Sequence, residues 1–214
     1  MDQTALLIAA TLASGTPLAL AGLGLLINEK AGVLNLGAEG MMLVAAIAGF
    51  AAAFTTGSDT AAFIAGAAAG GLLAAGFGAL VIWLNTNQYA TGLAVSLFGY
   101  GFSAFVGVGY VGQKLSERTP FEVPVLGQIP FIGPALFRHH PMVYIAIALI
   151  AASVWFLYRS RAGLVLRAVG ESPESAHALG YKVRWIRLAA VVAGGAMCGL
   201  AGAFLSVVYA PLWV

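Results

Sequence analysis

The sequence predicts an all-α membrane protein, a polytopic helix bundle of about six transmembrane helices with one short helix in the cytoplasm. Charged residues are scarce, at 8% of the 214 residues, whereas a soluble domain has roughly 25%. Long uncharged stretches separate these charges, and roughly 20 apolar residues are enough to span a bilayer. A soluble globule could not cover this much apolar surface, so we expect a single transmembrane domain over residues 1–214.

Each predicted span is an apolar segment bounded by polar or turn-forming residues. Asp2 precedes the first span without a basic segment, so we expect a retained helix and not a cleaved signal peptide. Paired small residues, Gly66 with Gly70 and Gly195 with Gly199, predict close helix packing within lipid. The predicted spans cover about residues 5–27, 33–54, 61–84, 90–111, 142–158 and 188–209.

Two hydrophilic loops orient the bundle. Residues 159–187 hold six of the ten basic residues, and short basic loops mark the cytoplasmic side. Residues 113–140 hold four of the eight prolines and are expected outside the cell, as an ordered loop. Counting back along the spans places residues 85–88 and 29–40 inside and residues 55–59 outside.

Glu39 is the only charged residue between Lys30 and Asp59. A carboxylate at membrane depth is costly, so its presence there indicates a function by default. Asn35 and the glycines around it favour a broken helix whose polar groups line a cavity. The alternative is that Glu39 braces the turn at the membrane surface, for example against Lys30.

Small and polar residues form a stripe along one face of the fourth span. Such a stripe can line a permeation path, or it can form hydrogen bonds between helices. The residues of the stripe are Gln88, Gly92, Ser96, Tyr100 and Ser103.

A short helix is predicted in the basic loop, over residues 171–180. Ser172 is a good N-cap, Pro173 suits the first helical position, and Gly180 can end the helix. A helix of two turns is not stable alone in water, so it needs a surface to pack on. That surface is the membrane domain itself, a cytoplasmic partner, or the lipid headgroups.

Several classes of function are excluded. The lone Cys198 allows no intramolecular disulfide, and a net charge of +2 is too small for a nucleic-acid surface. The chain has no phosphate-binding loop and therefore cannot hydrolyse ATP itself. His139 and His140 lack the spacing of a zinc site and are expected to be solvated. We find no catalytic constellation and expect no cofactor.

Four segments, in order, resemble one family. Residues 29–43 are similar to the signature near the start of nucleoside-type ABC transporter permeases, which belong with the ribose and branched-chain amino acid permeases. Residues 87–94 resemble the second marker of that family, and residues 132–144 resemble its external loop. Residues 159–180 resemble its coupling loop, which sugar permeases share.

The resemblance implies the transmembrane permease subunit of a bacterial ABC importer, in the inner membrane, that carries nucleosides. The 171–180 helix would be a coupling helix that docks on a separate ATPase subunit. Further implied partners are a second permease subunit, identical or homologous, and an extracytoplasmic substrate-binding protein or lipoprotein. The implied coupling residues are Arg167, Gly170, Glu171, Glu174, Ala176 and Gly180. The implied residues of the translocation path are Asn35, Glu39, Asn87, Gln88 and Ser96.

The chain departs from the family pattern at its end. Family members continue through further spans, so we expect this chain to be C-terminally short. The alternatives are a permease for simple sugars or branched-chain amino acids, an ATP-independent channel or facilitator, and a non-transporting assembly element.

Overall fold

The computed structural model describes residues 3–115, 121–122 and 136–213. Within these residues, six helical segments are long and apolar enough to cross a membrane, which confirms the predicted fold class. The long helices are α1 (Gln3–Lys30), α2 (Ala38–Thr56), α3 (Asp59–Trp83), α4 (Gln88–Gly107), α6 (Pro141–Arg159) and α9 (Val183–Phe204). The shorter helical elements are η1 (Val108–Tyr110), α7 (Arg161–Glu171), α8 (Pro173–Ala178) and the π-helical turn η3 (Leu205–Tyr209).

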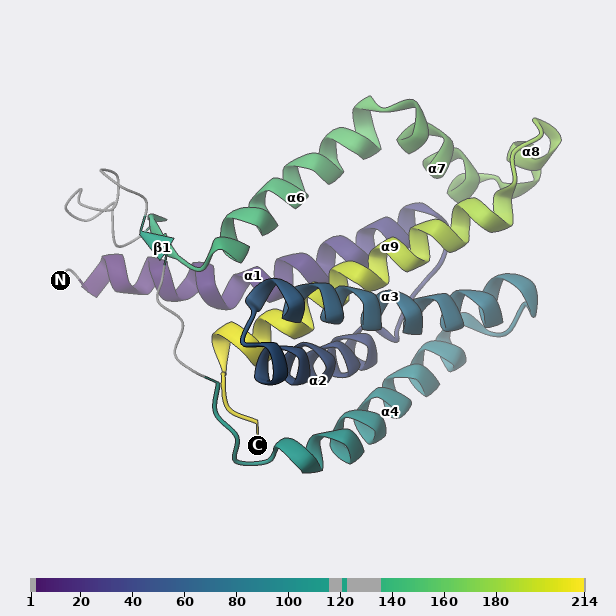
Figure 1. The fold of residues 1–214 in the computed structure, drawn as a ribbon. Coiled ribbons are helices and arrows are strands. Elements are labelled where there is room, and N and C mark those ends of the chain that lie inside the picture. Colours follow the sequence, from purple (N-terminus) through teal and green to yellow (C-terminus); the bar gives the residue numbers. More distant parts are fainter. Residues whose placement is uncertain (1–2, 116–120, 123–135, 214) are drawn as a thin grey trace.

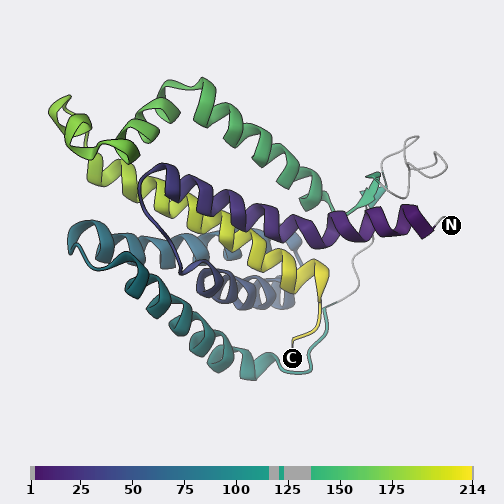
Figure 2. The same ribbon diagram turned by 180° about the vertical axis from the view of Figure 1, so that it is seen from behind.

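Helix α9 forms the centre of the bundle. It packs against α1, α2 and α3, while α6 lies against α1 and α4 lies against α2. Figures 1 and 2 show α6 and α4 at opposite margins of the molecule, with α9 between them. Both outer helices therefore leave one side free of the rest of the described bundle.

Polar side chains begin several of these helices. The Ser58 hydroxyl accepts a hydrogen bond from the Ala61 amide at the start of α3. The Asn87 Oδ1 atom accepts hydrogen bonds from the amides of Tyr89 and Ala90 at the start of α4. The first amides of a helix have no partner within the helix, so these caps fix where α3 and α4 begin.

The two glycine pairs singled out in the sequence pack against each other. A Cβ atom on Gly70 of α3 would lie 2.7 Å from the Cα atom of Gly199 on α9. A Cβ atom on Gly195 would likewise lie 2.7 Å from the Gly70 carbonyl oxygen. The predicted close packing is therefore present between α3 and α9, where backbone touches backbone.

One end of the bundle gathers the connections that the orientation places in the cytoplasm. The Trp83 and Trp185 rings meet edge to face with their centroids 5.4 Å apart. A Cβ atom on Gly32 would lie 2.8 Å from the Nη2 atom of Arg187. We call this the basic end of the bundle, comprising residues 29–32, 84–88 and 159–187.

The opposite end holds the two chain termini (Figure 1). Strands β1 (Phe121–Glu122) and β2 (Arg138–His139) pair there in antiparallel fashion. The predicted external loop 113–140 falls only in part on described residues. Its four prolines lie outside them: Pro120, Pro124, Pro130 and Pro134.

The last described residues return to the segment that follows α4. The Gly112 amide donates to the Trp213 carbonyl over 3.0 Å, and the Leu115 amide donates to the Pro211 carbonyl over 2.9 Å. These hydrogen bonds place the Trp213 side chain beside α2, where its ring centroid lies 5.4 Å from that of Phe50.

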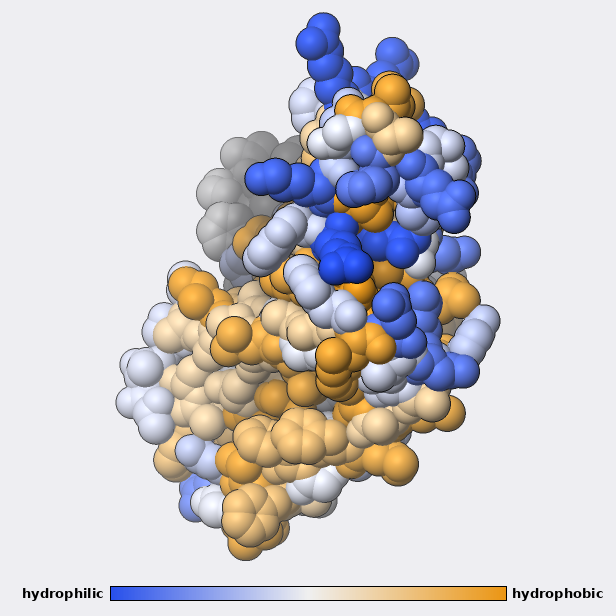
Figure 3. All heavy atoms as spheres, turned by 90° about the vertical axis from the view of Figure 1, so that its right-hand side faces the viewer, coloured by the Kyte–Doolittle hydropathy of each residue, from blue (hydrophilic) through white to orange (hydrophobic). Residues whose placement is uncertain are grey.

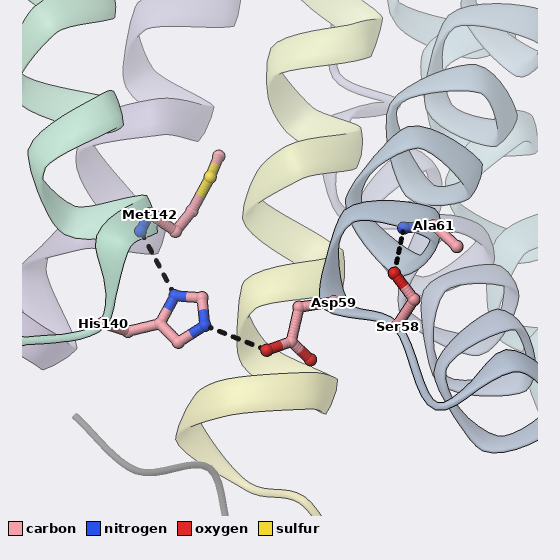
Figure 4. A network of polar contacts seen from close by, with 5 residues as sticks. All are labelled: Ser58, Asp59, Ala61, His140 and Met142. Carbon is pink, nitrogen blue, oxygen red and sulfur yellow. Dashed lines mark hydrogen bonds and ion pairs between the residues drawn. The ribbon is translucent and has the colours of Figure 1, made fainter. Parts of the chain in front are cut away.

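The prediction that His139 and His140 are solvated is wrong. His139 is buried, and the His140 Nε2 atom lies 3.4 Å from the Asp59 Oδ2 atom (Figure 4). The Met142 amide donates to Nδ1 of His140, so a neutral ring carries its proton on Nε2, facing Asp59. The ring thus joins the start of α6 to the start of α3, a long-range contact that sequence spacing does not reveal.

Two predicted boundaries also differ from the structure. The span expected over residues 33–54 begins at Ala38, because Gly32 adopts a φ of 75° and the residues after it are not helical. The span expected over residues 188–209 begins at Val183. Its first two turns carry Arg184 and Arg187, which lie before the apolar segment.

Candidate functional site

Residues 31–37 join α1 to α2 in a non-helical segment that lies against α4. The Leu34 amide donates to Gln88 Oε1 over 2.7 Å, and the Ser96 hydroxyl donates to the Leu36 carbonyl over 2.9 Å. Non-helical backbone at membrane depth needs such partners, because lipid offers none. Figure 1 shows the consequence, since α2 begins inside the bundle and not at the basic end.

Asn35 turns this segment into α2. Its Oδ1 atom accepts a hydrogen bond from the Gly37 amide over 2.8 Å, and the side chain is buried. The Asn35 Nδ2 atom contacts the Met41 sulfur at 3.5 Å. An asparagine that bonds to the backbone two residues on mimics a tight turn, so Asn35 acts locally as the hinge before α2.

Four of the predicted path residues thus hold backbone in place. Asn35 and Asn87 shape the starts of α2 and α4, while Gln88 and Ser96 satisfy residues 31–37. None of the four is among the described residues that line the cavity beside Glu39. Their part in a translocation path stays a prediction.

Glu39 is the fifth predicted path residue, and the structure places it differently. It lies in the first turn of α2, and its Oε2 atom accepts a hydrogen bond from the Tyr100 hydroxyl over 3.1 Å. Tyr100 lies twelve positions beyond Gln88, the first residue of α4, or about 18 Å at the rise of an α-helix. Tyr100 is therefore about halfway along the span from Gln88 to Tyr110, so we expect the carboxylate near the middle of the membrane.

A cavity of about 680 Å³ opens beside this pair. It extends from Glu39 toward the opposite end of the bundle, between α2, α4 and the segment after α9. Most of its wall is apolar, and the polar side chains on it are Glu39, Tyr100, Ser103 and Ser206. An apolar cavity with a few converging polar groups is the usual form of a small-molecule site.

The sequence does not predict the third wall of the cavity. Leu205, Ser206 and Trp213 close the cavity from the end of α9 onward. The Ser206 hydroxyl already donates a hydrogen bond to the Ala46 carbonyl over 2.8 Å. Nothing in the local pattern of residues 205–213 indicates that they fold back beside α4, so no sequence signal could have found this wall.

The electrostatics of the cavity favour Glu39 as a hydrogen-bond acceptor. The positive end of the α2 dipole supports a carboxylate in the first turn of that helix. Within the described part of the chain, no lysine or arginine forms an ion pair with Glu39. The carboxylate therefore keeps acceptor capacity beyond its hydrogen bond with Tyr100, and it presents that capacity to the cavity.

The predicted coupling residues divide into two groups. Arg167 and Gly170 lie on α7, where the Arg167 guanidinium stacks 5.1 Å from the centroid of the Tyr158 ring. Gly170 touches the backbone of Lys30 and Gly32 so closely that a Cβ atom would collide with it. These two residues join α7 to the membrane helices, and a role in coupling stays a prediction for both.

The predicted 171–180 helix is shorter than expected. Glu171 ends α7, and α8 begins only at Pro173, because a residue before proline is driven out of the helical region. Ser172 has non-helical backbone angles, and its hydroxyl donates to Ser175 Oγ over 2.7 Å and does not cap a backbone amide. Ala176 is buried, whereas Glu174 is exposed, so α8 is anchored on one side and open on the other.

The six spans, with a carboxylate beside an open cavity between α2 and α4, define a multi-pass membrane protein. Comparison with known families makes this more specific. Residues 7–212 match the family described as the branched-chain amino acid transport system / permease component. The chain belongs to this family, and the resemblance to that group of permeases is confirmed.

Individual relatives support the same assignment. A protein of Haloferax volcanii, provisionally named a glucose ABC transporter permease, is 42% identical over all of this chain. A guanosine ABC transporter permease of Bacillus subtilis and a nucleoside ABC transporter permease of Lactococcus lactis are 30% and 29% identical over 92% of it. This chain spans 66% of the length of each of the three relatives. No solved structure matches the chain.

Proposed function

We propose that the chain is the permease subunit of an ABC importer and that it carries nucleosides. The observation that carries the proposal is the Glu39–Tyr100 pair beside a cavity at mid-membrane depth. A carboxylate and a phenol together accept and donate hydrogen bonds, which suits the hydroxyl groups of an uncharged ring compound. The apolar wall, which includes the Trp213 ring, suits the flat base of a nucleoside.

Glucose is the second candidate substrate. The relative at 42% identity is provisionally named a glucose permease, while those named for guanosine and nucleosides are more distant. Glucose and ribonucleosides both present neighbouring hydroxyl groups to a carboxylate. They differ in the base, so competition between them separates the two candidates.

The proposal includes partners. A carboxylate at mid-depth cannot face lipid without a large cost, so the open side of the Glu39 cavity is the expected place of a second permease subunit. Helix α8, with Glu174 exposed, is the expected docking element for a separate ATPase. An extracytoplasmic binding protein would deliver substrate to the end opposite the basic end.

Uptake measurements test the proposal. Cells that express the permease with its ATPase are given labelled uridine or adenosine, with unlabelled glucose, ribose or leucine as competitors. We expect uptake that nucleosides alone inhibit and that an inactive ATPase abolishes. Inhibition by glucose would move the substrate to sugars, and uptake that persists without ATP hydrolysis would favour a facilitator.

A further inference from the structure

A second cavity, of about 750 Å³, lies at the basic end of the bundle. It is bounded by the end of α3, by α8 and by the start of α9, and it is separate from the Glu39 cavity. Figure 3 views the basic end and shows hydrophilic side chains gathered over its α8 side, next to a hydrophobic surface below. We call this cavity the basic pocket; the residues that matter here are Trp83, Glu174, Lys182, Arg184, Trp185 and Arg187.

The cations of the basic pocket have no ion-pair partner within the described ranges of the chain. Among the residues that the structure describes, no carboxylate forms an ion pair with Lys182, Arg184 or Arg187. The Nε atom of Arg187 is buried and has no hydrogen-bond acceptor. This Nε atom has no accessible surface, so a ligand in the pocket can reach Arg187 only through the part of its guanidinium that lines the pocket. Glu174 is the one carboxylate on the lining, which leaves a positive balance.

The aromatic residues set the depth of the basic pocket. Trp83 is the last residue of α3 and Trp185 lies in the first turn of α9, and their rings meet edge to face. Tryptophans gather where hydrocarbon meets headgroups, because the ring is apolar and its N–H is polar. We therefore expect the pocket at the level of the cytoplasmic headgroups, with its cations near the phosphates and its rings near the upper acyl chains.

We propose that the basic pocket binds the phosphate headgroup of an anionic phospholipid from the cytoplasmic leaflet. Lys182 and Arg184 would neutralise the headgroup, and the Arg187 guanidinium would donate to a phosphate oxygen. Basic pockets between membrane helices on the cytoplasmic side are suited to such headgroups, and arginine is well suited to phosphate. A lipid held there would tie α8 to the ends of α3 and α9.

Lipid retention by the purified permease tests the site. The protein is placed in nanodiscs of phosphatidylcholine, with or without phosphatidylglycerol, and bound lipid is counted by native mass spectrometry after release. We expect preferential retention of phosphatidylglycerol, and about 30-fold weaker retention in the double variant Lys182→Gln/Arg184→Gln, at roughly 1 kcal/mol per basic residue. The thermal midpoint of each variant shows that it is folded.

The matched control is Arg159→Gln/Arg161→Gln, which removes two exposed charges from the same end but outside the basic pocket. We expect this control to retain phosphatidylglycerol as the unmodified protein does. An equal loss in the control, or no preference for phosphatidylglycerol, would overturn the proposal. Complete displacement by inorganic phosphate would make this a phosphate site and not a lipid site. Unchanged lipid retention in Lys182→Gln/Arg184→Gln together with lost ATPase binding would assign the pocket to the ATPase.

Discussion

Glu39 combines a charge with a position near the middle of the membrane. Its neighbours explain how the fold holds it there, because the carboxylate lies at the positive end of the α2 dipole and accepts a hydrogen bond from the Tyr100 hydroxyl. Its side chain is not packed in the core but faces the 680 Å³ cavity. Changing it should therefore alter what the cavity binds more than how the protein folds.

We predict that Glu39→Gln lowers substrate uptake about tenfold, because a charge-assisted hydrogen bond is replaced by a weaker neutral one. Uptake of labelled nucleoside, normalised to the amount of permease in the membrane, measures the effect. The control is Glu29→Gln, which removes an exposed carboxylate at the basic end, outside the cavity. Equal losses in the two variants would show that the position of Glu39 has no special role.

For single residues, the sequence predicts which positions are important better than it predicts what their side chains do. The scarcity of charge was enough to single out Glu39, and helical spacing placed Tyr100 on the same face as Ser96 and Ser103. The hinge formed by Asn35 and the caps formed by polar side chains depend on local backbone geometry. The Trp213 wall depends on a long-range return of the chain, which no local pattern encodes.

Helices α3 and α9 approach each other closely because glycines, which have no side chain, lie at their contact. We predict that Gly70→Ala lowers the stability of the purified protein by about 1–3 kcal/mol, because the new methyl group would press on the Gly199 backbone. The thermal midpoint in detergent reports the change. Gly76→Ala on the same helix is the control, since a Cβ atom there meets nothing within 4 Å. A similar loss in both variants would mean that helix contact is not the cause.

Helix α8 offers a second test at the level of elements. We predict that Glu174→Lys reduces copurification of the ATPase, because the charge reverses on the exposed side of a short helix whose other side is anchored by Ala176. The same variant should not lose phosphatidylglycerol, since it adds positive charge to the basic pocket. Unchanged ATPase binding would count against α8 as the docking element, and it would leave the lipid site untouched.

The elements were predictable because the membrane demands long apolar runs, and each predicted span overlaps one observed span. The boundary errors have physical causes. Residues 33–37 are apolar enough to look helical, yet the turn at Gly32 and the turn formed by Asn35 keep them out of a helix. Helix α9 begins with a polar turn that precedes its apolar segment. Hydrophobicity alone does not predict that this turn is helical.

For the whole molecule, the distribution of basic residues predicts which end faces the cytoplasm. Cysteine labelling in intact cells tests it. The native Cys198 is fully buried, so it provides an unreactive background. Thr60 and Leu179 are both exposed and lie at opposite ends of the bundle. We predict that a membrane-impermeant maleimide labels Thr60→Cys in intact cells but labels Leu179→Cys only after permeabilisation. The reverse pattern would invert the bundle and place the basic pocket outside.

The segment before α2 has a consequence for how this permease can vary. Its contact with α4 is made through the backbone of Leu34 and Leu36, while both leucine side chains point outward and are 43% and 46% exposed. The position of Glu39 therefore does not depend on which side chains occupy positions 34 and 36. Substitutions at these two positions can reshape the outer surface for a different neighbour while the carboxylate stays at the same depth.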